Sequence, residues 1–349
     1  MATSALSLVE LEIEARGLLD PVTYDYFAGG ADDELTAREN EAAFAGLRLL
    51  PRVLRGAGTR SLEVTLLGTA AALPVLIAPT TGHRLVHPDG EAATARAAAG
   101  AGAIMTVSML STVAVEQVAA AGGPLWFQLY LQADRALTRA LVARAEAVGC
   151  LALVVTVDAS VPGRLTRDLR NDCTEQRAEL DHENLRDADG RVRDLELVAD
   201  LRWTDIEWLR SVTSLPIVLK GVLHPADVRL ALEHGVDALV VSNHGGRQLD
   251  GVMPTIEVLP AIAEEVAGRM PLILDGGVRR GTDVVKACAL GASAVAIGRP
   301  VAWGLAVDGE AGVAWVLAEL RAEMDRALAL CGCASPVELT PDLVVRRPR

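Results

Sequence analysis

The sequence predicts an α/β protein with a (β/α)8 TIM barrel and an N-terminal helical extension. Eight short apolar runs, rich in β-branched residues, recur along the chain, and an alanine-rich stretch of helical character follows each of them. Strands that alternate with helices pair in parallel through right-handed crossovers, and eight such units close a barrel. The composition agrees: 51% of the residues are hydrophobic but only 3% are aromatic, so Ala, Val and Leu form most of the core.

The predicted strands are bounded by residues that interrupt regular structure. Runs such as LPVLIAPTT, SLPIVLKG, VDALVVSNHGG and MPLILDGG open with a breaker and end in polar residues or glycines. Catalytic groups of such barrels lie at the carboxyl ends of the strands, so these ends form the predicted active site. In chain order, the predicted strands are residues 74–78, 103–107, 125–130, 151–158, 216–220, 237–242, 271–275 and 294–298.

We expect residues 1–349 to form a single domain. Residues 1–70 predict two or three helices and the short extended piece LEVTLLG, which together are too small for a separate domain and pack over the barrel. The barrel is expected over residues 71–305, and further helices over residues 306–349.

The segment 164–200, after the fourth predicted strand, is poor in large apolar residues. A stretch of this composition cannot bury much surface, so we expect an exposed, mobile loop that covers the active site. A surface insertion without such a role explains the composition equally well.

The charge balance argues against polyanionic partners. The chain has 33 basic and 46 acidic residues, which gives a net charge of −13, and no cluster of five or more basic residues opposes it. Such a surface repels nucleic acids and anionic membranes. No run approaches the roughly 18 apolar residues of a membrane span, and acids occupy the N-terminus where a secretory signal needs basic residues. We expect a small-molecule substrate.

The cysteines indicate neither a disulfide framework nor a metal site. They are odd in number, scattered, and without the spacing of metal ligands. The predicted location is therefore the reducing cytoplasm. They are Cys150, Cys173, Cys288, Cys331 and Cys333.

Glycines and arginines after the seventh and eighth predicted strands indicate an anion site. The chain reads DGGVRRGTD after one strand and IGRP after the other. Glycines let backbone N–H groups approach an anion, and a helix N-terminus and a guanidinium add positive charge. The last two loops are the usual phosphate site of a barrel, so Arg279 and Arg299 are candidate phosphate ligands. The alternative is that the glycines only form turns and the arginines pair with surface acids.

His244 is the candidate general base. It follows the sixth predicted strand in the sequence SNHGGRQLD, beside two glycines and three residues before Arg247. This placement suits a base next to a group that holds an anion. Asp158, at the end of the fourth strand, is the candidate to orient the histidine. Lys220, which ends the fifth strand, either stabilises an electron-rich ring or forms a salt bridge.

Together these motifs resemble the FMN-dependent α-hydroxy acid oxidases and dehydrogenases, the family of glycolate oxidase, lactate oxidase and mandelate dehydrogenase. Within that family the general likeness is to the 4-hydroxymandelate oxidase type. The resemblance implies a homotetramer that oxidises a 2-hydroxy acid to the 2-oxo acid and passes the electrons to molecular oxygen or another acceptor. The matching segments, in family order, are YDYFAGGADDE with RENEAAF, LPVLIAPT with HPDGE, WFQLY, TVD, LKGVL, VSNHGGRQLDG, LDGGVRRGTDVVKACALGA and IGRP.

The resemblance also implies which residues bind FMN. One group faces the flavin N5 side, a second bonds the ring edge, Lys220 lies by N1 and O2, and the others hold the ribityl chain and the phosphate. In that order they are Pro79, Thr80 and Thr81; Ser108, Gln128 and Thr156; Lys220; Ser242 and Asp275; and Gly277, Arg279, Gly298 and Arg299.

On the substrate side, the resemblance implies that Arg247 and Tyr26 hold the carboxylate and that Tyr130 bonds the hydroxyl oxygen as it becomes a carbonyl. His244, partnered by Asp158, takes a proton. The proton comes from the hydroxyl if hydride passes to the flavin, or from the carbon if a carbanion forms, and the sequence does not choose between these routes.

The chain departs from the family pattern at Leu165. The loop after the fourth strand reads DASVPGRLTRD, and the family carries a second carboxylate-binding arginine where Leu165 stands. Arg164, one residue earlier, is expected to point the other way. Loss of a charge-assisted hydrogen bond to a carboxylate costs about 1.5–3 kcal/mol, roughly ten- to a hundredfold in binding.

Two other pocket positions are unusual. Thr81 narrows the space near N5, whereas Leu110 favours a larger, for example aryl, substrate side chain. The substrate is then either an acid held by one arginine or a hydroxy compound whose carboxylate is masked as an amide or ester. A different interpretation is a flavin-binding protein with weak or no turnover.

Overall fold

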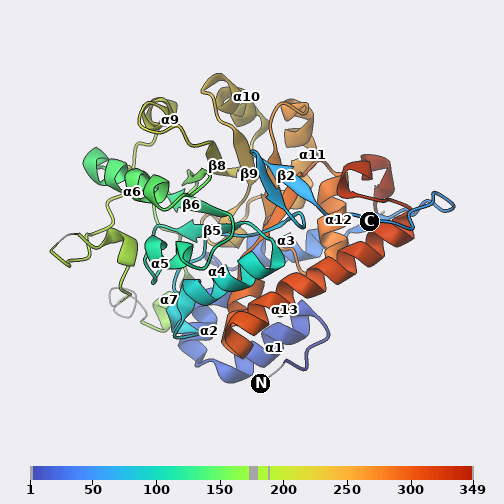
Figure 1. Ribbon diagram of the computed structural model, residues 1–349, viewed down its shortest axis with the longest axis horizontal. Helices are drawn as coiled ribbons and strands as arrows, with labels where there is room; N and C mark the ends of the chain where they lie inside the picture. The colour runs from blue at the N-terminus through green and yellow to red at the C-terminus, as the bar shows by residue number, and fades with distance from the viewer. Residues whose placement is uncertain (1–2, 173–179, 188, 348–349) are drawn as a thin grey trace.

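The computed structural model describes residues 3–172, 180–187 and 189–347. Eight parallel strands form a closed barrel (Figure 1), in which each strand lies beside its neighbours in the chain and the last closes against the first. This confirms the predicted fold, since every predicted strand overlaps one strand of the barrel. The strands are β4 (Val75–Ile77), β5 (Met105–Ser108), β6 (Leu125–Leu129), β7 (Leu153–Thr156), β8 (Ile217–Val222), β9 (Ala238–Val241), β10 (Leu272–Asp275) and β11 (Ala294–Ile297).

The barrel strands are buried on both faces, which explains why they read as unbroken apolar runs. Alternate strand residues form one hydrophobic cluster, in which the large Trp126 is accompanied by Ala152, Ala238 and Ala294. Large and small side chains together fill the narrow interior of a barrel. The intervening strand residues pack under the surrounding helices.

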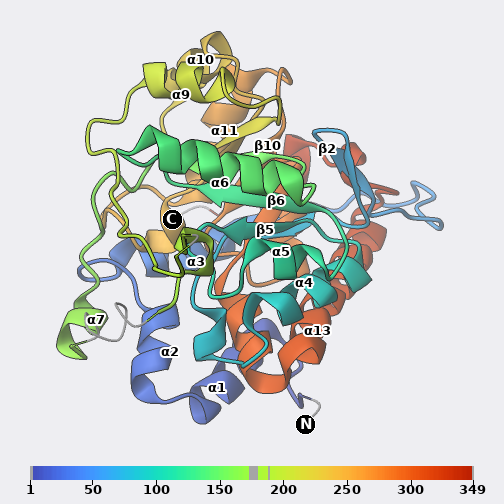
Figure 2. The ribbon, with the colours of Figure 1, turned by 60° about the vertical axis from the view of Figure 1, so that its left-hand side comes forward.

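Helices surround the barrel in Figures 1 and 2. Each lies between two strands in the chain, as parallel pairing requires. Shorter elements sit in the loops at the carboxyl ends of the strands: α7 (Thr166–Arg170) and the 3-10 turns His83–Leu85, Glu183–Leu185 and His244–Gly246. The outer helices are α4 (Gly90–Ala101), α5 (Val115–Ala119), α6 (Arg135–Ala147), α9 (Trp203–Arg210), α10 (Pro225–Glu233), α11 (Thr255–Val266) and α12 (Gly281–Ala289).

The N-terminal extension contains the expected helices. Ser7 caps α1 (Leu8–Leu18), and Asp20 caps α2 (Pro21–Ala28), where proline occupies the first turn. α3 (Leu35–Ala45) and β1 (Leu47–Leu49) follow, and the LEVTLLG piece forms part of a hairpin of β2 (Val64–Leu66) and β3 (Thr69–Ala71). α2 contacts α7, and α3 contacts the turn that carries His244, so the extension reaches the carboxyl ends of the strands.

The chain after the barrel differs from the predicted helices over residues 306–349. α13 begins earlier, at Arg299, and runs to Cys331, with one interruption at Asp308 and Gly309. The chain then forms short 3-10 turns and β12 (Val344–Arg346), which pairs antiparallel with β1. The two strands come from opposite ends of the chain, so no local pattern reveals this pairing.

Within residues 3–172, 180–187 and 189–347, α13 is the one helix long and apolar enough to cross a membrane. More than half of its apolar stretch is buried inside the protein, where α13 packs against α1, α4 and α12. A buried helix in the core of a protein can be as long and as apolar as a membrane-spanning helix.

The break in α13 brings its two parts together at Gly304 and Gly312. A Cβ atom added at Gly312 would lie 1.9 Å from the carbonyl oxygen of Gly304. We expect Gly312→Ala to lower the midpoint of thermal unfolding, because overpacking of this kind costs about 1–3 kcal/mol. Gly17→Ala in α1 is the control, since an added Cβ there meets nothing within 4 Å. Equal midpoints for the two variants would contradict the close approach.

Candidate active site

A cavity of about 400 Å³ opens at the carboxyl ends of the barrel strands. It brings together predicted site residues from the extension, the strand ends and the connecting loops. Those in its wall are Tyr26, Pro79, Thr80, Thr81, Ser108, Leu110, Tyr130, Leu165, Lys220, His244, Arg247, Asp275, Gly277, Arg279, Gly298 and Arg299. Four other predicted residues lie behind the wall, hydrogen-bonded to it directly or through one another: Gln128, Thr156, Asp158 and Ser242.

Three buried polar side chains form a row across neighbouring strands. Ser108 Oγ donates to Gln128 Oε1 at 3.0 Å, and Gln128 Nε2 donates to Thr156 Oγ1 at 3.0 Å. The row follows from the strand register, which sets Ser108 opposite Gln128 at the ends of β5 and β6. It presents amide and hydroxyl groups along one line, where they can form hydrogen bonds with the polar edge of a planar ring.

Lys220 is a buried cation at the end of β8. Its Nζ donates to Ser242 Oγ at 3.1 Å and lies 3.5 Å from Asp275 Oδ2, and its side chain is only 5% exposed. The other carboxylate oxygen, Asp275 Oδ1, is buried without a hydrogen-bond partner among the described residues. A buried acceptor of this kind calls for a polar ligand, because leaving it unpaired is costly.

The ends of β10 and β11 carry two arginines beside glycines. Gly277 has a φ of 84°, and a Cβ atom there would lie 2.3 Å from the carbonyl oxygen of Asn40, so only glycine fits. Arg279 pairs with Glu41 at 2.8 Å, while its buried Nε has no partner in the described part of the chain. Burial, together with the charges of Arg247 and Arg279, lowers the pKa of Arg299 to about 9.

Arg299 forms no ion pair with an acid among the described residues. Its guanidinium donates to the backbone carbonyls of Phe27, Gly245 and Gly29 at 2.7–3.0 Å, which orient it without neutralising it. α13 begins at the same point, and the dipole of its N-terminus adds partial positive charge. An anion bound here would gain from both.

His244, the predicted general base, and Asp158, its predicted partner, lie within hydrogen-bond distance of each other. His244 Nδ1 lies 3.1 Å from Asp158 Oδ1, and the backbone N–H of His244 donates to Ser242 Oγ at 3.0 Å. Burial raises the pKa of Asp158, but the His244 and Lys220 charges outweigh it and hold the pKa below its usual value. An ionised Asp158 keeps the ring proton on Nδ1, so Nε2 is the nitrogen that can accept a proton.

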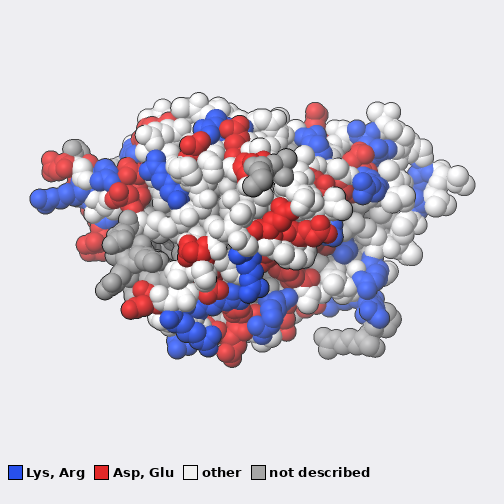
Figure 3. All heavy atoms as spheres, turned by 90° about the horizontal axis from the view of Figure 1, so that it is seen from below, with Lys and Arg blue, Asp and Glu red and all other residues white. Residues whose placement is uncertain are grey.

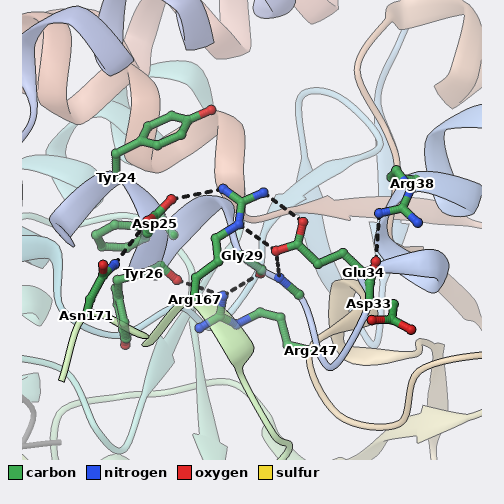
Figure 4. A network of polar contacts seen from close by, with 12 residues as sticks. Tyr24, Asp25, Tyr26, Gly29, Asp33, Glu34, Arg38, Arg167, Asn171 and Arg247 are labelled. Atoms are coloured by element: carbon green, nitrogen blue, oxygen red, sulfur yellow. Dashed lines mark hydrogen bonds and ion pairs between the residues drawn. The ribbon is translucent and has the colours of Figure 1, made fainter. Parts of the chain in front are cut away.

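Arg247, Tyr26 and Tyr130 face the same cavity as the histidine. Arg247 Nη1 donates to the carbonyl oxygens of Tyr26 and Gly29 at 2.7 and 2.9 Å, as Figure 4 shows. Its guanidinium carbon lies 5.4 Å from the centre of the Tyr26 ring. Burial raises the pKa of Tyr130, followed in effect by the Asp158 charge, so the phenol stays protonated.

Leu165 lines the cavity, whereas Arg164 does not. The Arg164 side chain is 68% exposed and lies 3.4 Å from Asp32 on the surface. A single antiparallel bridge between Leu165 and Ala31 sets this alternation, because successive side chains of an extended segment point to opposite sides. Arg164 thus provides no substitute for an arginine at position 165.

The structure adds wall residues that sequence reasoning missed. Leu180, His182, Leu195 and Leu197 come from the predicted loop 164–200, whose residues 173–179 and 188 lie outside the described residues. His182 Nδ1 donates to the Leu110 carbonyl oxygen at 3.0 Å. The leucines of this otherwise polar segment are the sequence signal that could have identified it as part of the wall. Because they line the cavity, the described part of this loop closes one side of it.

Buried Asn184 anchors the same loop. Its side-chain amide donates to Ser111 Oγ at 2.8 Å and to the Ser108 carbonyl oxygen at 3.2 Å, and its Oδ1 accepts from Val115 N. His83 was also missed: its Nε2 lies 2.6 Å from the hydroxyl of Thr80 in the cavity wall. Both residues contact the wall through hydrogen bonds, and no sequence motif predicts these contacts.

Comparison with known proteins yields one consistent family. The family model described as FMN-dependent dehydrogenase matches residues 15–346. An L-lactate oxidase from Nostoc sp. is 45% identical, over 95% of this chain and 96% of that protein. The solved structure of a mandelate oxidase is 41% identical and covers 99% of both chains with a TM-score of 0.90.

A further solved structure is a mandelate oxidase variant, in which an arginine is replaced by leucine, with 2-hydroxy-phenylacetamide. It is 41% identical, with a TM-score of 0.88 and 99% of both chains covered.

The residues of the cavity fit FMN. The unpaired Asp275 Oδ1 matches a hydroxyl donor such as the ribityl chain, and Arg279 Nε and the uncompensated Arg299 match a phosphate. Lys220 and the row from Ser108 match a polar ring edge. The fold, this donor set and the match over nearly the whole chain agree, and the chain belongs to the family of FMN-dependent dehydrogenases.

Proposed function

We propose that the protein oxidises 2-hydroxy acids, or close analogues of them, to 2-oxo acids, with molecular oxygen as the electron acceptor. The observation that carries the proposal is the His244–Asp158 pair, which faces the same cavity as Arg247 and Tyr130. An acid–base group beside a cation and a phenol suits the removal of protons from an anionic hydroxy compound. Lactate and mandelate oxidases among the relatives support this reaction class.

Each residue then has a defined task. When bound, FMN would take up the two electrons that the substrate loses, together with one of the two protons. His244 accepts a proton at Nε2, and Asp158 stabilises the imidazolium that results. Tyr130 donates its proton in a hydrogen bond to the substrate oxygen that becomes the carbonyl. Arg247 binds the carboxylate through the N–H groups of its guanidinium that do not bond the Tyr26 and Gly29 carbonyls.

The wall of the cavity supports a substrate with a bulky apolar side chain, such as an aryl group. The loops contribute five leucines to its lining, at positions 110, 165, 180, 195 and 197. Mandelate, a 2-hydroxy acid with a phenyl side chain, is a suitable test compound. Leu165 also favours a second candidate, a substrate whose carboxylate is masked, and the leucine variant of mandelate oxidase with an amide supports it.

We expect anaerobic mandelate to bleach the yellow FMN form of the wild-type protein. His244→Ala should retain FMN but slow this reduction by at least about a hundredfold, the usual contribution of a positioned acid–base group. Stopped-flow absorbance measures the rate, and flavin fluorescence after denaturation measures the bound FMN. If no 2-hydroxy acid, amide or ester bleaches the wild type, the protein is a flavin-binding protein without this turnover.

Leu165→Arg tests whether the pocket lacks half of a carboxylate clamp. We expect it to raise kcat/KM for mandelate by about ten- to a hundredfold, because a charge-assisted hydrogen bond is added. Mandelamide should gain nothing or lose, since a desolvated guanidinium would then face no anion. Stopped-flow reduction with this matched pair gives the answer. An equal effect on acid and amide would show that Leu165 only packs under the loop.

For the assembly, we propose a homotetramer in the cytoplasm that binds neither nucleic acid nor membrane. The segment between β1 and β2 projects from the molecule in Figures 1 and 2, and its Val53 and Leu54 are exposed. The backbone N–H of Arg52 donates to the Cys331 carbonyl oxygen at 3.3 Å, which places this segment near the end of α13. Exposed apolar clusters of this kind mark association surfaces. On the face drawn in Figure 3, acidic and basic side chains are interspersed, which does not suit a polyanion.

Light scattering after gel filtration should give four times the chain mass of 36.7 kDa. The double variant Val53→Ser with Leu54→Ser should shift the mass toward smaller species, because it removes apolar surface from the projecting segment. A wild-type mass of one chain would rule out the tetramer.

A further inference from the structure

Arg167 forms an ion-pair cluster directly behind the wall of the cavity (Figure 4). It lies on α7, two residues after Leu165. Its Nε and Nη2 donate to the two carboxylate oxygens of Glu34 at 2.6 and 2.7 Å, and its Nη1 donates to Asp25 at 3.0 Å. One cation thus pairs with two acids of the N-terminal extension and offsets one of their two negative charges.

The acids of this cluster adjoin the turn that holds the two functional arginines. Glu34 Oε1 accepts from the backbone N–H of Gly30 at 3.2 Å. The carbonyl oxygen of the preceding Gly29 accepts from Arg247 at 2.9 Å and from Arg299 at 2.7 Å. Burial lowers the pKa of Arg247, and the Glu34 charge opposes that effect. Burial acts to raise the pKa of Glu34, but the hydrogen bond and charge of Arg167, with a smaller effect of the Arg299 charge, hold it below its usual value.

A tether between α7 and the extension does not require Arg167. The backbone N–H of Asp32 donates to the Arg164 carbonyl oxygen at 2.9 Å, and Ala31 pairs with Leu165 in an antiparallel bridge. Asn171 Nδ2 also donates to Asp25 at 3.0 Å. These contacts hold the segment in place without a charge, so the distinctive contribution of Arg167 is its positive charge.

We infer that Arg167 is a positioning residue that offsets one of the two negative charges of Glu34 and Asp25, and thereby reserves Arg247 for the substrate carboxylate and Arg299 for the FMN phosphate. The carboxylate part rests on the proposed function, whereas the phosphate part rests only on FMN binding. For the substrate carboxylate the cavity offers Arg247 alone among the described residues, whereas the family pattern has two carboxylate-binding arginines. The compensation of nearby acids therefore matters more here. Without Arg167, Glu34 opposes every anion brought to the two cations.

Removal of the charge and removal of the contact can be separated with five variants. Arg167→Gln leaves Glu34 uncompensated, and we expect it to raise the dissociation constant of FMN about three- to tenfold, measured by titration of the apoprotein with flavin fluorescence. It should raise KM for mandelate, leave kcat unchanged, and leave KM for mandelamide unchanged. Arg167→Lys keeps the charge and should stay near wild type. Arg164→Gln, which removes an exposed neighbouring cation, is the matched control.

The decisive variant is Arg167→Gln combined with Glu34→Gln. It has lost the ion pair but also the uncompensated acid, so FMN affinity and KM for mandelate should return to within about twofold of wild type. If the double variant is as impaired as Arg167→Gln alone, the cluster is a tether and the inference is overturned. Glu34→Gln alone gives the same decision where Arg167→Gln does not fold, because a tether predicts weaker binding of FMN and mandelate and charge compensation predicts binding at least as tight.

These readouts separate the inference from the proposed function. If neither mandelate nor mandelamide reduces the wild type, the substrate proposal fails, and the FMN dissociation constants of the single and double variants still decide the role of Arg167. If mandelate reduces the wild type but the double variant shows no recovery in either FMN affinity or KM, the substrate proposal stands and the inference fails.

Discussion

One backbone oxygen links the two halves of the active site. The carbonyl of Gly29, at the end of α2, accepts hydrogen bonds from both Arg247 and Arg299. The first cation faces the substrate region and the second faces the anion end of the cavity. Both residues are partly buried, and burial of a guanidinium is costly unless its N–H groups are paired. The turn after α2 therefore gives both cations a shared acceptor, in addition to the Gly245 carbonyl that Arg299 also bonds.

This constraint explains why the N-terminal extension belongs to the active site. The extension provides Tyr26, the Gly29 carbonyl and the acids that pair with Arg167, and it packs against the turn that carries His244. The barrel provides Lys220, the His244–Asp158 pair and the polar row at its strand ends. Neither part forms the cavity by itself, which is why a segment too small for its own core remains tightly packed on the barrel.

The charges in the cavity are arranged so that each has a different kind of partner. Lys220 is balanced by Asp275, and His244 is held by an ionised Asp158. Arg299 donates to backbone carbonyls, and burial with the nearby charges of Arg247 and Arg279 lowers its pKa. Binding of a phosphate would therefore offset the free-energy cost of burying the Arg299 charge. Leu165 adds the opposite feature, an apolar wall at the edge of the substrate region.

The sequence alone determined the barrel and most of the chemical groups, because strands buried on both faces read as continuous apolar runs and their polar ends fall at one edge of the barrel. It also identified Leu165 as a departure. Only the tertiary structure decided the start of α13 at Arg299, the pairing of β1 with β12, and the places of His182 and Arg167. These depend on contacts between segments far apart in the chain, and such contacts leave no periodic pattern in either segment.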